Sequence, residues 1–259
     1  MLRLFYIELI RSFVLNLRYP ANFVSSLVLN TLMFYGLFMG AQYLSGQQVF
    51  GERLDTMVVG YSAWVLVTKS VNKTPMAIQQ DADTGVLESL FLSGYRKDAM
   101  FLIRALAESV SDVVTVVLIV SLLVLFTGSR INLSPWVVLP VATLVLSAIG
   151  IGMLIGAFAL QVKRVSAILP AVQLLTLALM FTPFESLTSG WAQYLKPLGM
   201  ALPMVPSVVF LRQLLVYGTM DPQTLMQAVA NAVGYVVVGI IFFNLMIRRV
   251  KRKGLLGGH

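Results

Sequence analysis

Long stretches without a charged residue constrain this chain more than any other feature of its sequence. Four of them run from Tyr19 to Gly51, from Ile131 to Val162, from Val165 to Phe184 and from Pro222 to Ile247. Because a helix rises about 1.5 Å per residue, about 20 apolar residues cross the roughly 30 Å hydrocarbon core of a bilayer. The composition agrees, since 58% of the residues are hydrophobic and only 12% are charged. The sequence therefore predicts an integral membrane protein and excludes a soluble enzyme.

Two further stretches reach membrane length only if they include charged residues. One must continue past Lys69 and Lys73, and the other must contain Glu108 and Asp112. With these two, the predicted fold is an all-α membrane protein with six transmembrane helices. They are expected near residues 22–44, 56–79, 100–127, 137–160, 165–185 and 224–247.

The segments outside these spans also have helical patterns. Residues 1–18 alternate apolar and charged positions at helical spacing, which predicts an amphipathic helix in the membrane interface rather than a cleavable signal peptide. Residues 186–221 are too apolar for a solvated loop and are broken by prolines, which predicts external helices that re-enter the membrane. No internal repeat divides residues 1–259, so the chain is expected to form a single domain.

The distribution of basic residues predicts the orientation. Six spans place both termini on the same side, and fifteen of the nineteen Lys and Arg fall on that side. The four on the other side are Arg53, Arg130, Lys196 and Arg212. Because cytoplasmic loops carry an excess of basic residues, both termini are expected in the cytoplasm. Orientation also accounts for the net charge of +8, so a nucleic-acid partner is not expected.

The sequence gives no sign of a catalytic or metal site. There is no cysteine, and the one histidine is His259, so thiolate chemistry and histidine clusters are excluded. There is no phosphate-binding loop of the G-x-x-x-x-G-K-[ST] type. We therefore expect no catalytic residue and no bound metal, and any work that the chain does must use energy supplied by another protein.

The most informative polar segment, residues 80–95, lies between the second and third spans on the side predicted to be cytoplasmic. Its residues Asp81, Asp83, Gly85, Leu87 and Glu88 follow the order acidic-x-acidic-x-Gly-x-Leu-Glu. Apolar and polar positions then alternate at helical spacing, which predicts a short amphipathic helix along the membrane. Taken alone, this composition favours an ordinary interfacial loop.

With the overall topology, this motif resembles the cytoplasmic signature of ABC-2 type permeases, the membrane subunits of a class of ABC exporters. The basic N-terminal segment, the six spans, the sequence Arg104–Leu106 at the third span and the proline-broken region before the last span extend the resemblance over nearly the whole chain. The chain departs from the family at Ala82, where Arg is common, and at Gly94, where Pro is common.

The resemblance implies a function and partners. It implies that residues 80–95 are a coupling helix, with Asp81, Asp83, Gly85, Leu87 and Glu88 transmitting motion from a separate ATPase. Two ATPase copies would bind ATP and Mg²⁺, and the permease would pair with a second copy of itself or with a paralogue in a bacterial inner membrane. The expected substrate is hydrophobic, amphipathic or lipid-linked, with a drug or lipid favoured over a polysaccharide.

The charged residues within the second and third spans allow two interpretations. Lys69 and Lys73 are four residues apart, as are Glu108 and Asp112, and matching depths would pair Lys73 with Glu108 and Lys69 with Asp112. They either neutralise one another as structural ion pairs or line an inward-facing path for a polar part of the substrate. Glu185, at the external end of the fifth span, is a candidate gate residue.

Two rival functions remain at this point. The intramembrane charges would serve an ion-coupled secondary carrier, although no inverted repeat supports one. A non-transporting membrane scaffold is the other.

Two small-residue spacings, Gly36-x-x-x-Gly40 and Gly152-x-x-x-Gly156, predict close helix packing, either within the chain or at a dimer seam.

Overall fold

The computed structural model describes residues 2–46, 52–92, 96–129, 131–132, 134–160, 165–182, 184 and 192–252. Within these ranges the chain is all-helical and has no strand, as the sequence predicts. The helices are α1 (Leu2–Arg18), α2 (Pro20–Ser45), α3 (Glu52–Asp83), α4 (Val86–Leu92), α5 (Lys97–Thr127), α6 (Val138–Ala159), α7 (Leu169–Phe181), α8 (Ala192–Ala201), α9 (Val205–Leu215) and α10 (Pro222–Arg252). Short 3₁₀ turns, η1 (Pro135–Val137) and η2 (Val165–Ala167), precede α6 and α7.

Four helices in the described part of the chain are long and apolar enough to cross a membrane. They run over Pro20–Gly40, Lys97–Thr127, Pro135–Ala159 and Pro222–Val250. These correspond to the spans expected near residues 22–44, 100–127, 137–160 and 224–247. α3 covers the fifth expected span, 56–79, and its 32 residues exceed membrane length, but its charged residues make it too polar to join the four.

The remaining expected span, 165–185, corresponds to a shorter helix. α7 has 13 residues and is therefore about 20 Å long, less than the thickness of the hydrocarbon core. It ends before Thr182, whose backbone is extended, and Pro183 comes next in the sequence. A residue before proline avoids the helical region, which explains why the apolar run does not continue as helix.

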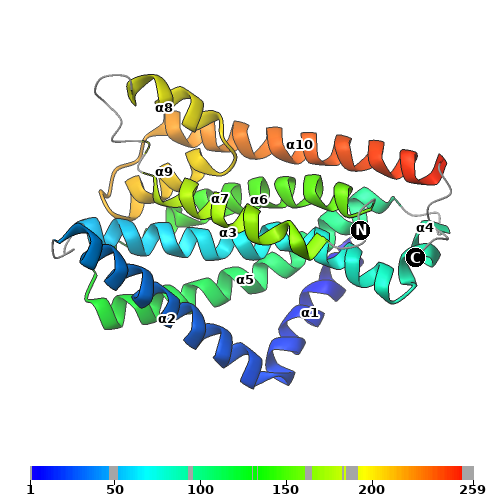
Figure 1. Cartoon of the computed structure of the whole chain (residues 1–259), viewed down its shortest axis with the longest axis horizontal. Coiled ribbons are helices and arrows are strands. Elements are labelled where there is room, and N and C mark those ends of the chain that lie inside the picture. Colours follow the sequence, from blue (N-terminus) through cyan, green and yellow to red (C-terminus); the bar gives the residue numbers. More distant parts are fainter. Residues whose placement is uncertain are drawn as a thin grey trace.

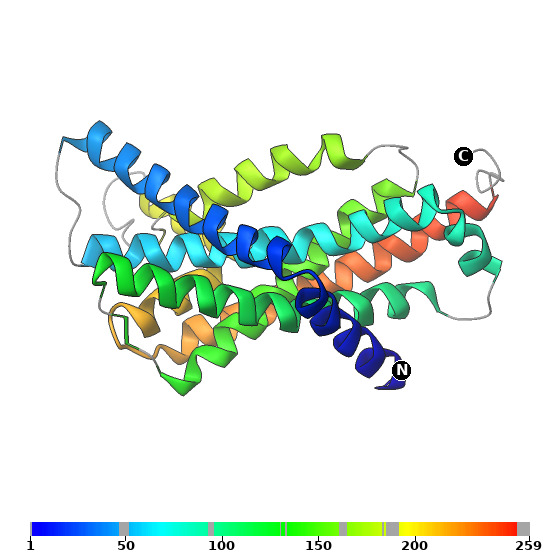
Figure 2. The same ribbon diagram turned by 90° about the horizontal axis from the view of Figure 1, so that it is seen from below.

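α6 forms the centre of the molecule, between α3 and α10 (Figures 1 and 2). Glycines on two sides of α6 let these neighbours approach it closely. A Cβ atom on Gly150 would lie 2.5 Å from the carbonyl carbon of Tyr235 on α10, and one on Gly152 would lie 2.7 Å from the carbonyl oxygen of Val71 on α3. Backbone contact of this kind maximises van der Waals attraction between helices in lipid.

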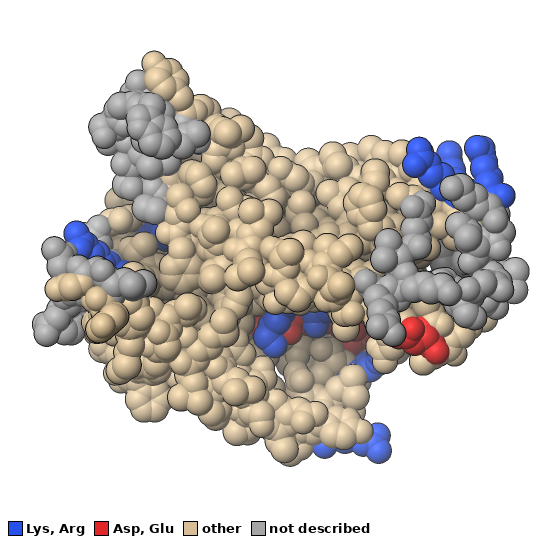
Figure 3. Space-filling model, in the orientation of Figure 1, with Lys and Arg blue, Asp and Glu red and all other residues tan. Residues whose placement is uncertain are grey.

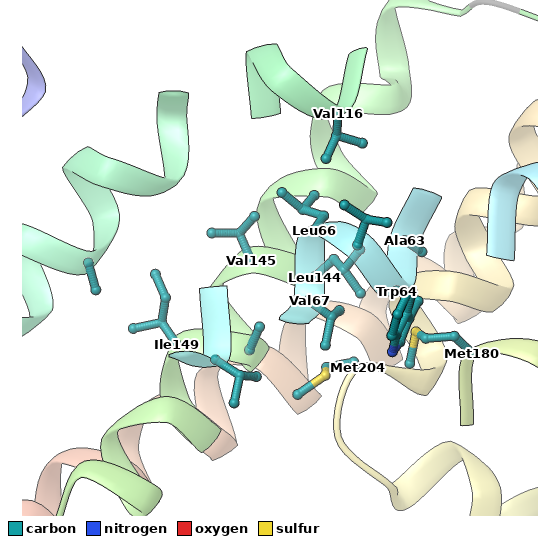
Figure 4. Close-up of a cluster of buried hydrophobic side chains, with 14 of the residues drawn as sticks. Ala63, Trp64, Leu66, Val67, Val116, Leu144, Val145, Ile149, Met180 and Met204 are labelled. Atoms are coloured by element: carbon teal, nitrogen blue, oxygen red, sulfur yellow. The ribbon is translucent and has the colours of Figure 1, made fainter. Parts of the chain in front are cut away.

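The buried core lies mainly between α3 and α6. Figure 4 shows Trp64, Leu66 and Val67 of α3 beside Leu144 and Ile149 of α6. The side chains of Val67, Leu144 and Ile149 have no solvent exposure. These apolar side chains fix α3 against α6, and so also fix the position of the charged residues farther along α3.

α2 packs much less closely against the rest of the chain. Only 6% of the apolar stretch within Pro20–Gly40 is buried, and Figure 2 shows α2 along the outside of the bundle. A Cβ atom added to Gly36 or Gly40 of α2 would have no neighbour within 4 Å, whereas Gly152 and Gly156 of α6 face Val71 and Thr74 of α3. The second small-residue spacing therefore packs within the chain, and the first is open.

The two ends of the molecule differ. The start of α1, the short helix α4 and the basic C-terminal end of α10 lie at one end, which we call the α4 end (Figure 1). The helices α8 and α9 lie at the opposite end, the α8–α9 end. Residues 186–221, expected to be re-entrant, thus contain two short helices, of which α9 is buried against α10, α6 and α3.

Candidate functional site

A line of six alternating charges connects α3 to α5, and we call it the charge ladder. α3 carries Lys69, Lys73 and Asp81, and α5 carries Arg104, Glu108 and Asp112. The contacts are Asp81–Arg104 at 3.5 Å, Arg104–Glu108 at 3.3 Å, Glu108–Lys73 at 3.5 Å, Lys73–Asp112 at 2.9 Å and Asp112–Lys69 at 3.8 Å. Later residues of α3 meet earlier residues of α5, so the two helices are antiparallel.

The ladder contains both ion pairs that the sequence predicts and extends beyond them. Lys69 meets Asp112, and Lys73 meets Glu108, but the shortest contact of Lys73 is with Asp112. Arg104 joins the ladder through Asp81, a pairing that the sequence did not predict. Three basic and three acidic groups balance, which lowers the cost of placing charges in a membrane helix pair.

Lys69 is the least compensated member of the ladder. Among the described residues, only Asp112 lies within ion-pair distance of its ammonium group, at 3.8 Å. Its side chain is 28% exposed, more than that of any other ladder residue, while Asp112 is 11% exposed. Asp112 is thus paired mainly with Lys73. The ammonium group of Lys69 therefore keeps hydrogen-bond donors that it does not use.

The exposed side of Lys69 faces a polar cavity of about 270 Å³, which we call the α1–α2 recess. It lies between the ladder and the bend that joins α1 to α2. Its lining consists of Ser12, Leu15, Asn16, Tyr19, Asn22, Phe23, Ser26, Lys69, Lys73, Ser111, Asp112 and Thr115. Figure 3 shows basic and acidic side chains together inside a hollow on this face of the molecule.

A hydrogen bond fixes α1 across the recess. The side-chain amide of Asn16 on α1 donates to the hydroxyl of Ser111 on α5, at 2.7 Å. The hydroxyl of Thr115 donates to the backbone carbonyl of Ser111, so the Thr115 hydroxyl and this carbonyl are already paired with each other. The hydrogen bond from Asn16 therefore holds the bend between α1 and α2 across the recess from Lys69.

The segment expected to be a coupling helix consists of two parts. α3 continues to Asp83, and α4 begins at Val86. Gly85 joins them with a φ of +71°, a left-handed conformation that glycine adopts without strain. Its N–H donates to the carbonyl of Ala82 at 3.1 Å, which closes a tight turn. Gly85 thus sets the direction in which α4 leaves α3.

The acidic residues of the motif have different surroundings. The carboxylate of Asp81 faces Arg104 in the ladder and is 14% exposed, whereas Asp83 is exposed. Leu87 is buried, with 4% exposure, and anchors α4 on the bundle. The side chain of Glu88, together with Gly94 and Glu185, lies outside the described residues.

A buried arginine at the α8–α9 end was not recognised as a site residue from the sequence. Arg212 of α9 is 1% exposed, and its guanidinium donates to the backbone carbonyls of Met180 and of Thr182, the latter at 3.3 Å. It therefore caps the C-terminal end of α7. Its position in the apolar stretch Val205–Leu215 is the sequence signal that identifies it, because a lone charge there needs buried partners.

A second unpredicted group is Asn231 of α10. Its side-chain oxygen accepts hydrogen bonds from the Ser147 hydroxyl at 3.2 Å and from the Met204 N–H at 3.2 Å, and its amide donates to the Leu202 carbonyl at 3.0 Å. These bonds connect α6 and α10 to the turn between α8 and α9. The interaction fixes the α8–α9 end against the centre of the bundle.

The site has no arrangement suited to metal binding in the part of the chain that the structure describes. No three His, Cys, Asp or Glu residues there lie close enough together to hold an ion. The charge ladder places a basic group between successive acids, so its carboxylates are neutralised by ion pairs.

Comparison with known proteins assigns the chain to a family. No match was found among curated proteins. A family model described as ABC-2 type transporter matches residues 3–210, which extend from α1 into α9 and include the charge ladder and α4. Members of this family are membrane transport subunits. Because the match covers well over half of the chain, the protein belongs to the ABC-2 type transporter family.

Proposed function

We propose that this chain is the permease subunit of an ATP-driven exporter in the inner membrane of a bacterium. Family membership is the observation that carries the proposal. Two copies of a separate ATPase would bind and hydrolyse ATP with Mg²⁺, and the permease would convert their motion into outward movement of a substrate. The permease itself would perform no chemistry.

The coupling step would act on α4 and its connection to α3. The rigid turn at Gly85, the buried anchor Leu87 and the exposed acid Asp83 support this role. A push on α4 would reach α3 directly, and from Asp81 it would pass through Arg104 to α5. The turn, the anchor and the ladder thus form one mechanical connection, with Glu88 as the further acidic contact that the family motif implies.

We further propose six membrane crossings, with both termini and α4 in the cytoplasm. Besides the four long apolar helices, α3 would cross with the charge ladder toward its cytoplasmic side, where Lys69 reaches the headgroup level, and α7 would cross in part. The short helices α8 and α9 would re-enter from the external side, with Glu185 near the exit. The basic end of α10 and the start of α1 lie at the α4 end, consistent with an excess of positive charge in the cytoplasm (Figure 3).

The permease would function as a dimer with a second copy or a paralogue. α2 is the best candidate for the seam because it is the least buried long helix and because Gly36 and Gly40 are open to a close neighbour. The substrate would be hydrophobic, amphipathic or lipid-linked and would leave the cytoplasm or the inner leaflet, with a drug or lipid favoured over a polysaccharide.

Copurification tests the proposal. The tagged chain is expressed in its natural host, extracted in mild detergent and analysed by mass spectrometry, and the ATPase activity of the eluate is measured. We expect an ATPase in equal amount. Asp83→Arg and Glu88→Arg should each release it, whereas Lys196→Glu, a charge reversal on exposed α8, should retain it.

Two results would contradict the proposal in different ways. Retention of the ATPase by both charge reversals would show that α4 is not the coupling element. Purification of an intact dimer without any ATPase would favour an ion-coupled carrier that uses the charge ladder, or a membrane scaffold. Proton-driven uptake or efflux in reconstituted vesicles distinguishes these two, because only the carrier shows it.

A further inference from the structure

The α1–α2 recess has a net positive lining although the charge ladder as a whole is neutral. Lys69 and Lys73 face it, whereas Asp112 is the one acidic residue in its lining. Glu108, which contacts both Lys73 and Arg104, and Asp81, which contacts Arg104, are not part of the lining. The side chains of Lys69 and Lys73 are 28% and 22% exposed, and that of Asp112 is 11% exposed, so the basic groups are the more accessible ones.

The opposite wall adds positive potential and hydrogen-bond donors. α2 begins at Pro20 beside the recess, and no side chain caps its N-terminus. The N-terminal end of a helix attracts anions because its first N–H groups are unpaired, and since Pro20 has no N–H, the donors of α2 are the N–H groups that follow it. Asn22, in this first turn, lines the recess and offers an amide group. Both walls therefore favour an anion over a cation.

The recess also lies at the level expected of a lipid headgroup. α2 is a membrane-length helix whose apolar run starts at Pro20, and α1, which precedes it, is amphipathic. The boundary between the polar and apolar parts of the bilayer therefore falls near Tyr19, an aromatic residue of the kind that is enriched at that depth. Leu15 and Phe23 add apolar contacts to the lining of the same cavity.

We propose that the α1–α2 recess binds the phosphate group of an anionic membrane amphiphile, with the ammonium group of Lys69 as its main contact. Asp112 keeps Lys73 at 2.9 Å, so Lys69 can turn toward a ligand without leaving that carboxylate unpaired. The volume of about 270 Å³ admits a headgroup phosphate but not a whole lipid, whose chains would remain in the bilayer.

This assignment adds a ligand class to the proposed exporter, and it rests on that proposal only if the bound amphiphile is the cargo. Binding itself requires neither an ATPase nor ATP. A failed binding experiment would remove the recess as a site and leave the exporter proposal intact. A failed ATPase copurification would have the opposite consequence.

Native mass spectrometry of the full-length protein in detergent tests the assignment. Phosphatidylglycerol and a diacylglycerol with identical chains, which lacks the phosphate, are titrated separately, and inorganic phosphate is added as a soluble competitor. We expect the protein to prefer phosphatidylglycerol. Lys69→Met should weaken that preference about tenfold, since it removes a charged hydrogen-bond donor. Lys196→Met, on exposed α8, is the matched control and should leave it unchanged.

Asn22→Asp provides a second variant that keeps Lys69. It places a carboxylate on the α2 wall of the recess and should also reduce phosphatidylglycerol binding, and because Asn22 is exposed, the fold should be retained. Competition by inorganic phosphate would support a site that recognises the phosphate alone. If both variants lose the preference and inorganic phosphate does not compete, the recess recognises the phosphate as part of a lipid molecule. Equal binding of the two lipids, or an unchanged preference in Lys69→Met and Asn22→Asp, would overturn the proposal.

Discussion

α3 associates with α5, and α6 with α10, through two different kinds of contact. Apolar side chains gain little from leaving lipid for another apolar surface, so membrane helices need close packing or polar contacts to associate. α6 and α10 use backbone contact at Gly150 and Gly239, whereas α3 and α5 use the charge ladder. Long charged side chains leave room for a cavity beside them, and glycine contacts leave none. α6 and α10 are therefore in direct backbone contact, whereas the α3–α5 contact borders the α1–α2 recess.

The largest effect is expected where α6 and α10 touch. A Cβ atom on Gly239 would lie 2.5 Å from the carbonyl oxygen of Gly150, a backbone atom that cannot rotate away. Gly239→Ala should therefore lower the free energy of unfolding by about 3 kcal/mol. Thermal unfolding in detergent, followed by size-exclusion chromatography, measures the loss.

Gly234→Ala is the matched control for this prediction. Gly234 is on the same helix and has no atom within 4 Å of its Cβ position. Alanine favours helix over glycine, so stability should stay the same or rise by less than about 1 kcal/mol. Equal destabilisation by both alanines would show that α6 and α10 are not in backbone contact.

A smaller effect is expected from breaking the ladder at its centre. Asp112 contacts both Lys73 and Lys69, so Asp112→Asn should leave Lys69 without its one ion-pair partner among the described residues. We expect a loss of about 2 kcal/mol, since an uncompensated charge remains in a partly buried position. The double variant Lys69→Met, Asp112→Asn should recover part of that loss. Additive effects of the two changes would argue against the ion pair.

Removal of Lys69 alone should cost less than about 1 kcal/mol, because Asp112 keeps its closer partner Lys73. The protein should remain folded and keep its elution volume in size-exclusion chromatography, and its melting temperature should differ little from that of the unchanged protein. A loss as large as that of Asp112→Asn would show that Lys69 is a structural residue, and the recess would then not be available for a ligand.

The smallest effect concerns the start of α10. Asp221 accepts hydrogen bonds from the Thr224 hydroxyl at 2.6 Å and from the Gln223 N–H at 3.0 Å, which hold the pKa of its carboxyl below the usual value of 3.8. This stabilisation is complete above pH 3.8 and disappears as the pH falls through the lowered pKa. Asp221→Asn should lower the melting temperature slightly at pH 7, and the difference should vanish in acid. A difference that persists at low pH would assign the effect to something other than the carboxylate.

The sequence predicts most of the long helices because charge-free runs and membrane thickness leave few alternatives. The helix found within residues 165–185 is shorter than the expected span, because α7 ends at Phe181, before the extended Thr182, and hydropathy does not register such an end. The predictions of six crossings, of their orientation and of re-entry by residues 186–221 stay predictions. They depend on the membrane, which lies outside the chain itself.

The ladder could be predicted in part because charges in membrane helices need partners. Spacing of four residues on each helix predicted the pairs of Lys69 with Asp112 and of Lys73 with Glu108. The shorter contact of Lys73 with Asp112 and the role of Arg104 depend on the exact offset of α3 against α5, which periodicity does not define. The recess was not predictable, because it arises from the bend between α1 and α2. Whether the ladder lines a substrate path stays a prediction.

The cap that Arg212 places on α7 has a consequence for biosynthesis. The ribosome completes α7 about thirty residues before it reaches Arg212, so the carbonyls of Met180 and Thr182 initially lack this donor. An unpaired carbonyl in hydrocarbon costs several kcal/mol. We therefore expect α7 to stay at the insertion machinery until α9 has been made. α7 and α9 should pack together only after Arg212 has been made, because its guanidinium pairs the carbonyls at the end of α7.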